Sequence, residues 1–131
     1  MRRYFRLALT IAFSVPMIFA GPALALDTPK VIETRDTAIG AVLTNLDGMT
    51  LYTFDEDSPG GSSCYGRCID NWPPLKADAN TGPIGDFSII TREDGIAQWA
   101  YKGKALYQWV RDKAPGDTTG DGVRGRQAGH P

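Results

Sequence analysis

The sequence has few of the side chains on which most enzyme active sites and metal centres depend. Its 131 residues include two cysteines and a single histidine, His130, next to the end of the chain. Catalysis by a nucleophile and a base requires close alignment of the two groups, for which a lone histidine at this place is a poor candidate. The chain also has no Gly-rich phosphate loop and no nucleophile elbow. We therefore expect a protein that is not an enzyme.

Positive charge is also scarce and scattered. The chain has 14 Lys and Arg against 15 Asp and Glu, and three of the arginines, Arg2, Arg3 and Arg6, lie at the start of the chain. The remainder is therefore acidic and has no basic stripe. Nucleic acids and anionic membrane surfaces are not expected as partners.

The one long apolar run lies near the N-terminus, in residues 7–20. It follows the basic start of the chain and precedes Ala23-Leu24-Ala25, a small-x-small cleavage pattern. This order predicts a secretory signal peptide over residues 1–25 that is removed, with an uncleaved membrane anchor as the alternative. No later run is long enough to cross a bilayer, and no cysteine follows the cleavage pattern to carry a lipid. A periplasmic or secreted location is expected.

The exported part contains one ten-residue pattern twice. Residues 48–57 and 103–112 both read Gly-x-x-Leu-Tyr-x-aromatic-x-x-Asp, and residues 44–48 and 91–95 share the form Thr-x-x-Asp-Gly. Tyrosine, phenylalanine and tryptophan suit the pleated surface of a strand, so both copies are predicted as strands. The sequence therefore predicts a domain built from two similar units.

The recurring motif has three defining side chains in each copy. They are Tyr52, Phe54 and Asp57 in the first copy and Tyr107, Trp109 and Asp112 in the second. Because side chains alternate along a strand, the two rings of each copy share a face. We expect these rings to form the core, with a ligand-stacking surface as the alternative. Each Asp is expected to cap the following turn by accepting from backbone N–H groups.

Short predicted strands separated by Gly and Asp turns indicate an all-β domain. The first unit is predicted as a β-hairpin over residues 38–54, and the second as a three-stranded meander over residues 86–110. At most one short helical turn is expected, near the cysteines at residues 68–72, because Pro73 and Pro74 stop any helix. We expect a monomer with the domain at residues 38–122, after an N-terminal arm or edge strand at 26–37. Residues 123–131 are expected to form a weakly ordered tail.

These motifs resemble the bacterial secreted-repeat proteins, often lipoproteins, that carry a Tyr-x-(Phe/Trp/Tyr)-x-x-Asp motif. Ser63-Cys64-Tyr65-Gly66 and Trp72-Pro73-Pro74-Leu75 add to the resemblance, which covers residues 38–122. It implies an exported domain of unsettled biochemical function and supplies no catalytic residues. The chain departs from the family by lacking the lipid-anchor cysteine. It also departs at residues 125–131, which lack a Trp-containing apolar strand to close the domain.

Cys64 and Cys68 are expected to form a structural disulfide, which is the usual state of a cysteine pair in an oxidising compartment. Four residues of helix-like chain bring two Cα atoms to about 6 Å, within disulfide range. A redox-active pair and a thiolate metal site are the alternatives. The spacing is not Cys-x-x-Cys, and zinc requires four ligands.

A second candidate site lies at residues 117–122. Asp117, Thr119 and Asp121 occupy alternate positions ahead of Gly122, as in the first half of a calcium loop. The twelfth position is Ala128 instead of the usual glutamate. The loop is therefore predicted either as a polar turn or as a weak Ca²⁺ site, and no other cofactor is expected.

The sequence as a whole predicts an exported, non-enzymatic β-domain that binds an envelope protein or a small ligand. A periplasmic redox or metal-handling protein, using Cys64 and Cys68 or the loop from Asp117 to Asp121, is the alternative. A cell-envelope hydrolase that uses carboxylates in the turns is a third hypothesis, and it requires two of them in one pocket, about 5–10 Å apart.

Overall fold

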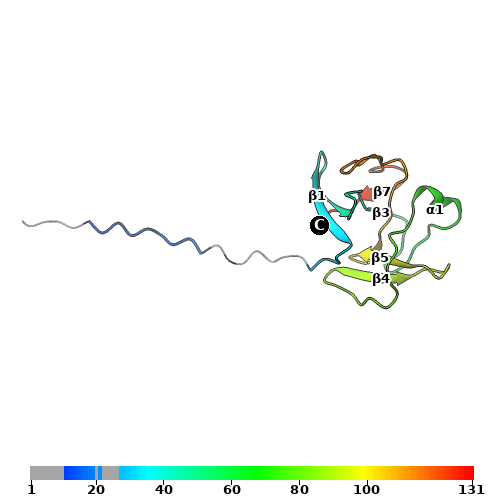
Figure 1. Ribbon diagram of the computed structural model, residues 1–131, viewed down its shortest axis with the longest axis horizontal. Coiled ribbons are helices and arrows are strands. Elements are labelled where there is room, and N and C mark those ends of the chain that lie inside the picture. Colours follow the sequence, from blue (N-terminus) through cyan, green and yellow to red (C-terminus); the bar gives the residue numbers. More distant parts are fainter. Residues whose placement is uncertain (1–10, 20, 22–26) are drawn as a thin grey trace, which may run out of the picture.

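The computed structural model describes residues 11–19, 21 and 27–131 (Figure 1). The predicted signal peptide, residues 1–25, lies largely outside the described residues, and its described part, residues 11–19 and 21, has no regular secondary structure. No helix in the described ranges has the length and apolar content to cross a membrane. The elements in chain order are β1 (Ile32–Thr37), β2 (Gly40–Asn45), β3 (Tyr52–Phe54), α1 (Arg67–Asn71), β4 (Phe87–Thr91), β5 (Ala97–Tyr101), β6 (Lys104–Ala105) and β7 (Arg126–Ala128).

The predicted all-β class is confirmed. In the part of the chain that the structure describes, all strand pairs are antiparallel and form three small sheets with the orders β1-β2, β3-β7 and β4-β5-β6. The one helix among the described residues, α1, is a single short turn beside the cysteines and ends at Asn71, just before Trp72-Pro73-Pro74. Figure 1 shows β3 and β7 side by side, with β4 and β5 below them.

The first unit contains the expected chain reversal at residues 45–48 and has one strand more than predicted. Across this reversal Thr44 pairs with Thr50, and the Leu51 N–H donates to the Leu43 carbonyl at 2.8 Å. The additional strand, β1, forms a further hairpin with β2, joined by Ala38 and Ile39, with Thr37 opposite Gly40. Of the two predictions for the segment before residue 38, an arm or an edge strand, the edge strand is found at β1. Its residues are mostly exposed and polar, and only Ile32 is buried, so its apolar signal in the sequence is weak. The turn predicted at residues 45–48 is present, and Asn45 Oδ1 accepts from the backbone N–H groups of Asp47 and Met49.

The second unit is a three-stranded meander, as the sequence predicts, but its third strand, β6, ends at Ala105 instead of residue 110. Beyond β6, Tyr107 makes isolated bridges to Tyr52 and Pro74. The first turn of the meander, at residues 92–95, is closed by the Gly95 N–H bonding to the Arg92 carbonyl at 3.0 Å. The second turn consists of Lys102 and Gly103, with φ of 49° and 81°. Two consecutive positive φ values match the right-handed twist of a two-residue hairpin, and glycine adopts them without strain.

The two copies of the repeated motif lie against each other. The backbone N–H of Tyr52 donates to the Tyr107 carbonyl and the N–H of Tyr107 to the Tyr52 carbonyl, both at 2.8 Å. Their side chains divide as the strand alternation predicts. The tyrosines join one buried cluster and the preceding leucines, Leu51 and Leu106, join the other.

Each repeat is completed by a segment of the other. Leu75, from the first repeat, donates to the Leu106 carbonyl at 2.9 Å and accepts from the Trp99 N–H at 2.9 Å. Gly129, from the second repeat, makes the equivalent bonds in the first: it donates to the Leu51 carbonyl and accepts from the Leu43 N–H, both at 2.8 Å. The two repeats are therefore interlocked and form one structural unit.

The C-terminal segment is ordered, contrary to the weakly ordered tail expected from its composition. β7 pairs with β3, with Tyr52 opposite Ala128 and Phe54 opposite Arg126. Ala128 is buried, as is Gly129. The physical reason is that β7 is held by backbone pairing and a stacked arginine. An apolar side-chain pattern is not needed, and the expected Trp-containing closing strand is replaced by this short polar one.

Candidate functional site

The motif tyrosines and aspartates pair between the repeats. Tyr52 donates its hydroxyl to Asp112 Oδ2 at 2.7 Å, and Tyr107 donates its hydroxyl to Asp57 Oδ2 at 2.6 Å. All four side chains are buried. The Tyr and Asp of one motif copy therefore act on the opposite copy, which explains physically why both residue types recur.

The second oxygen of each aspartate holds the loop that follows it. Asp57 Oδ1 accepts from the N–H and hydroxyl of Ser63, both at 2.8 Å. Asp112 Oδ1 accepts from the N–H of Thr119 at 3.0 Å and from its hydroxyl at 2.6 Å. Each carboxylate does accept a backbone N–H, as the motif predicts. The hydrogen bond from a tyrosine hydroxyl to Oδ2 of each aspartate could not be inferred from one repeat alone, because the tyrosine comes from the other repeat.

The environment of the two tyrosines favours their neutral forms. Burial, followed by the hydrogen bond to the carboxylate, raises the pKa of both hydroxyls well above the ordinary value of 10.0. An ionised tyrosine beside the carboxylate would place two negative charges together in a region with little water. These tyrosines are therefore donors that hold the fold together.

The fourth motif ring, that of Trp109, has a different environment. Tyr52, Phe54 and Tyr107 are buried in one cluster, whereas Trp109 is only partly buried against it. Trp109 stacks on Trp72, with ring centroids 4.0 Å apart and planes at 24°. Trp72 is itself 4% exposed, so Trp109 is the outer ring of the pair.

The tryptophan pair lines a cavity of about 550 Å³. Asn71, Arg111 and Arg124 also line it. Gly120 packs behind the pair, where a Cβ atom would lie 2.9 Å from Trp72 Cη2 and 3.0 Å from Trp109 Cγ. A larger residue at that position would displace both rings, so glycine is required for the stack.

Two arginines line this cavity, and a third lies against Trp72. Arg111 and Arg124 are exposed, and the Arg111 guanidinium lies 5.6 Å from the Trp109 ring centroid. Arg126 is 7% exposed and lies behind Trp72, with its guanidinium 5.0 Å from that ring and 3.6 Å from the Phe54 ring. None of these residues was predicted as a site residue. The one feature of the sequence that pointed to this part of the structure was the Trp-Pro-Pro segment at residues 72–74.

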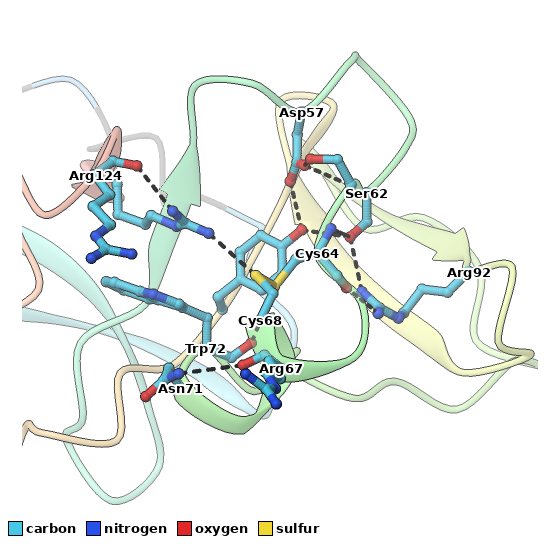
Figure 2. The surroundings of a disulfide bond; sticks show 12 residues. Asp57, Ser62, Cys64, Arg67, Cys68, Asn71, Trp72, Arg92 and Arg124 are labelled. Atoms are coloured by element: carbon cyan, nitrogen blue, oxygen red, sulfur yellow. Dashed lines mark hydrogen bonds between the residues drawn. A yellow bond between two sulfur atoms is a disulfide. The ribbon is translucent and has the colours of Figure 1, made fainter.

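The predicted disulfide is present next to the tryptophan pair. Cys64 and Cys68 are joined, with Cα atoms 5.2 Å apart. Figure 2 shows the bond between Trp72 on one side and the loop held by Arg92 on the other. Arg126 donates an N–H to Cys68 Sγ at 3.2 Å.

Arg92 fixes the cysteine loop from the second repeat. Its side chain is fully buried, and it donates to the Cys64 carbonyl, to Ser62 Oγ and to Gln98 Oε1. It also forms an ion pair with Asp94 at 3.0 Å, which lowers the pKa of that carboxyl. The cysteine loop, which begins in the first repeat, is therefore anchored on the second.

The candidate calcium loop uses its oxygens within the protein. Asp117 Oδ2 accepts from the N–H groups of Lys113 and Ala114, and these bonds lower its pKa. Asp121 Oδ1 accepts from the N–H of Ala128 at 2.9 Å, and the Thr119 hydroxyl bonds to the motif aspartate as given above. Within the described ranges, no three residues among His, Cys, Asp and Glu form a group suited to a metal ion. The loop geometry is that of a hydrogen-bonded polar turn.

Comparison with known proteins adds one match. A family model described as a secreted repeat of unknown function matches the chain twice, at residues 33–76 and 88–126. The two matches cover the two interlocked units, and the second includes the first residue of β7. No curated protein and no solved structure matches the chain significantly.

Proposed function

The chain belongs to the family of secreted repeats of unknown function, and from this premise we propose that it is an exported, non-enzymatic binding module. We place its ligand site at the cavity lined by Trp72 and Trp109, which we call the tryptophan cavity. The partial exposure of the Trp109 ring is the observation that carries this proposal. Three of the four motif rings are buried as scaffold, and the fourth lines an open cavity.

The shape and lining of the tryptophan cavity suit a small planar ligand. Binding sites for small molecules are concave, commonly about 300–1,000 Å³, and lined by aromatic side chains with a few polar groups. The tryptophan cavity, at about 550 Å³, falls in this range. The rigid support behind it is also typical of a binding site, because an outer ring held by a stack and by Gly120 loses little entropy when a ligand arrives.

The same lining supports a binding role over catalysis. The tryptophan cavity is lined by Trp, Arg, Asn, Thr and Val side chains, which can stack and donate hydrogen bonds. The histidine that could serve as a base, His130, bonds through Nδ1 to the Ala41 carbonyl at 2.8 Å. The buried carboxylates Asp57 and Asp112 are both engaged in the hydrogen bonds that join the repeats.

Indole N–H signals in a ¹H–¹⁵N NMR spectrum test this proposal with an internal control. The chain has three tryptophans, and Trp99 lies in the other buried cluster, away from Trp72 and Trp109. We would titrate the protein with 2-naphthoate and with its uncharged analogue 2-naphthamide. A ligand with about a dozen non-hydrogen atoms, at roughly −0.3 kcal/mol each, binds with a Kd on the order of 1 mM.

We expect saturable shifts of the Trp72 and Trp109 signals with at least one of the two compounds, while the Trp99 signal stays in place. Replacing Trp109 by Ala should abolish the binding, whereas replacing its exposed neighbour Val110 by Ala should not. If neither compound shifts the two signals, or if all three tryptophans shift together, the tryptophan cavity is not the binding site.

The alternative function, thiol–disulfide exchange by Cys64 and Cys68, is supported by one contact. Arg126 donates an N–H to Cys68 Sγ, and its positive charge would stabilise the Cys68 thiolate of the reduced pair. An external thiolate would reach the partly exposed Cys68 sulfur and expel the Cys64 thiolate. The Cys64 sulfur is fully buried and lies 4.0 Å from the Trp72 carbonyl oxygen, which makes the Cys64 thiolate a poor leaving group. We therefore rank the redox role second.

Thiol labelling distinguishes the two roles of the disulfide. After equilibration of the folded protein in a thiol–disulfide buffer poised at about −280 mV, a structural disulfide stays closed and takes up no alkylating reagent. A redox pair is reduced and labelled at both cysteines under the same conditions. Labelling of both cysteines in the folded protein would favour thiol–disulfide exchange over ligand binding as the function.

A further inference from the structure

Three arginines lie at or beside the tryptophan cavity without an ion-pair partner among the described residues. Two of its lining residues, Arg111 and Arg124, and the adjacent Arg126 carry guanidinium groups. In the described part of the chain, the one ion pair joins Arg92 to Asp94, so no carboxylate lies within ion-pair distance of these three arginines.

The guanidinium of Arg126 is fixed in position by its contacts within the fold. Arg126 is 7% exposed, and its guanidinium bonds to Cys68 Sγ and to the Arg124 carbonyl and lies over the Phe54 ring at 3.6 Å. These partners satisfy N–H groups without cancelling the charge. Burial is the largest effect on the pKa of Arg126 and lowers it, whereas the charges of Asp57 and Glu56 act in the opposite direction. A buried cation is costly unless a negative charge compensates it, so an anion in the cavity would be stabilised.

Arg124 and Arg111 are placed to contact such an anion directly. Figure 2 shows the Arg124 side chain beside the Trp72 ring, and Arg111 reaches the Trp109 ring from another part of the chain. Both guanidinium groups are exposed, so they can turn toward a ligand while the ring stack stays fixed. A guanidinium also matches a carboxylate with two parallel hydrogen bonds.

We propose that the ligand of the tryptophan cavity is a small planar aromatic anion, whose ring stacks on Trp109 and whose acid group meets Arg111 and Arg124. This inference rests on the proposed function and specifies its ligand class. It also assigns a role to Arg126, which raises the positive potential of the site from behind Trp72. Neutral and cationic compounds of the same shape bind more weakly.

The test compares 2-naphthoate with 2-naphthamide, which have nearly the same shape and differ in charge. In wild-type protein at about 20 mM salt, we expect the naphthoate to bind about fivefold more tightly, the upper end of the range for one solvent-exposed ion pair. The preference should shrink toward unity at about 500 mM salt, where exposed charges are screened.

Arginine variants locate the effect. The double variant Arg111→Gln with Arg124→Gln should lose the preference for naphthoate while still binding naphthamide. Lys76→Gln removes an exposed positive charge away from the cavity and should keep the full preference. The Trp99 indole signal, in the other cluster, reports that each variant is folded.

The outcomes separate this inference from the proposed function. Equal affinity for the two compounds, with shifts still confined to Trp72 and Trp109, overturns the anion preference and leaves the binding site standing. A preference that persists in the arginine double variant also overturns it. Absence of binding by both compounds contradicts the proposed function, and this inference falls with it.

Discussion

Replacing Tyr107 by Phe deletes one hydroxyl and leaves the ring in place. That hydroxyl donates to Asp57 Oδ2 at 2.6 Å, and Asp57 is 3% exposed, so water cannot readily replace the lost donor. A hydrogen bond to a charged group contributes about 1.5–3 kcal/mol. We expect Tyr107→Phe to lower the free energy of unfolding by about 2–3 kcal/mol, a large part of the 5–15 kcal/mol typical of a domain.

A double-mutant cycle identifies the partner of the hydroxyl. Combining Tyr107→Phe with Asp57→Asn should show a coupling energy of about 1–2 kcal/mol, because each single change already breaks the same bond. The matched control pairs Tyr107→Phe with Asp112→Asn, the aspartate of its own motif copy. Tyr52 is the donor to that carboxylate, so this cycle should be additive within about 0.5 kcal/mol.

Urea denaturation followed by circular dichroism supplies the four free energies of each cycle. The reasoning is refuted if Tyr107 couples to Asp112 as strongly as to Asp57, because the motif would then act within one repeat. A cost below about 0.5 kcal/mol for Tyr107→Phe, the size of an ordinary surface change, would refute it as well.

Three further perturbations test other parts of the structure. Because the fold raises the pKa of the two motif tyrosines, the unfolded chain loses these protons at lower pH, so the free energy of unfolding should hold below pH 10 and fall above it. Denaturation midpoints measured against pH should show this fall, and Tyr52→Phe should reduce its slope. A flat profile up to pH 11 would contradict the expectation. Gly120→Ala should lower the free energy of unfolding by about 1–3 kcal/mol, because its Cβ would lie 2.9 Å from atoms of the Trp72 and Tyr52 rings. Gly61→Ala, with its nearest atom at 3.7 Å, should be neutral in the same thermal unfolding experiment, and equal costs would remove the steric explanation. Separate fragments of residues 27–81 and 82–131 should be unfolded alone and regain the β-rich circular dichroism spectrum when mixed, and an independently folded fragment would show that the repeats are not interlocked.

Local chain reversals could be predicted from the sequence because their signals are local. Asp-Gly and Lys-Gly pairs mark the turns at residues 45–48, 92–95 and 102–103, and the structure has turns at all three. The disulfide followed from the compartment and the spacing of Cys64 and Cys68. The duplicated motif gave two similar units, and the structure has them.

Pairing between distant segments could not be predicted, because it depends on which other segment of the chain the fold brings to the edge of each strand. β7 has the sequence Arg-Gln-Ala, without strand-forming residues, and is defined by its register against β3. The tryptophan cavity combines residues from three separate stretches, around Trp72, Trp109 and Arg124. No spacing in the sequence shows that these three side chains meet, so the site became visible only in three dimensions.

A crystal structure of the protein with 2-naphthoate is the most direct test of the functional account. The account predicts ligand density in the tryptophan cavity, with the naphthalene ring against Trp109 and the carboxylate at Arg111 or Arg124. Density for the ligand at another place on the protein, with the tryptophan cavity unchanged, would contradict it.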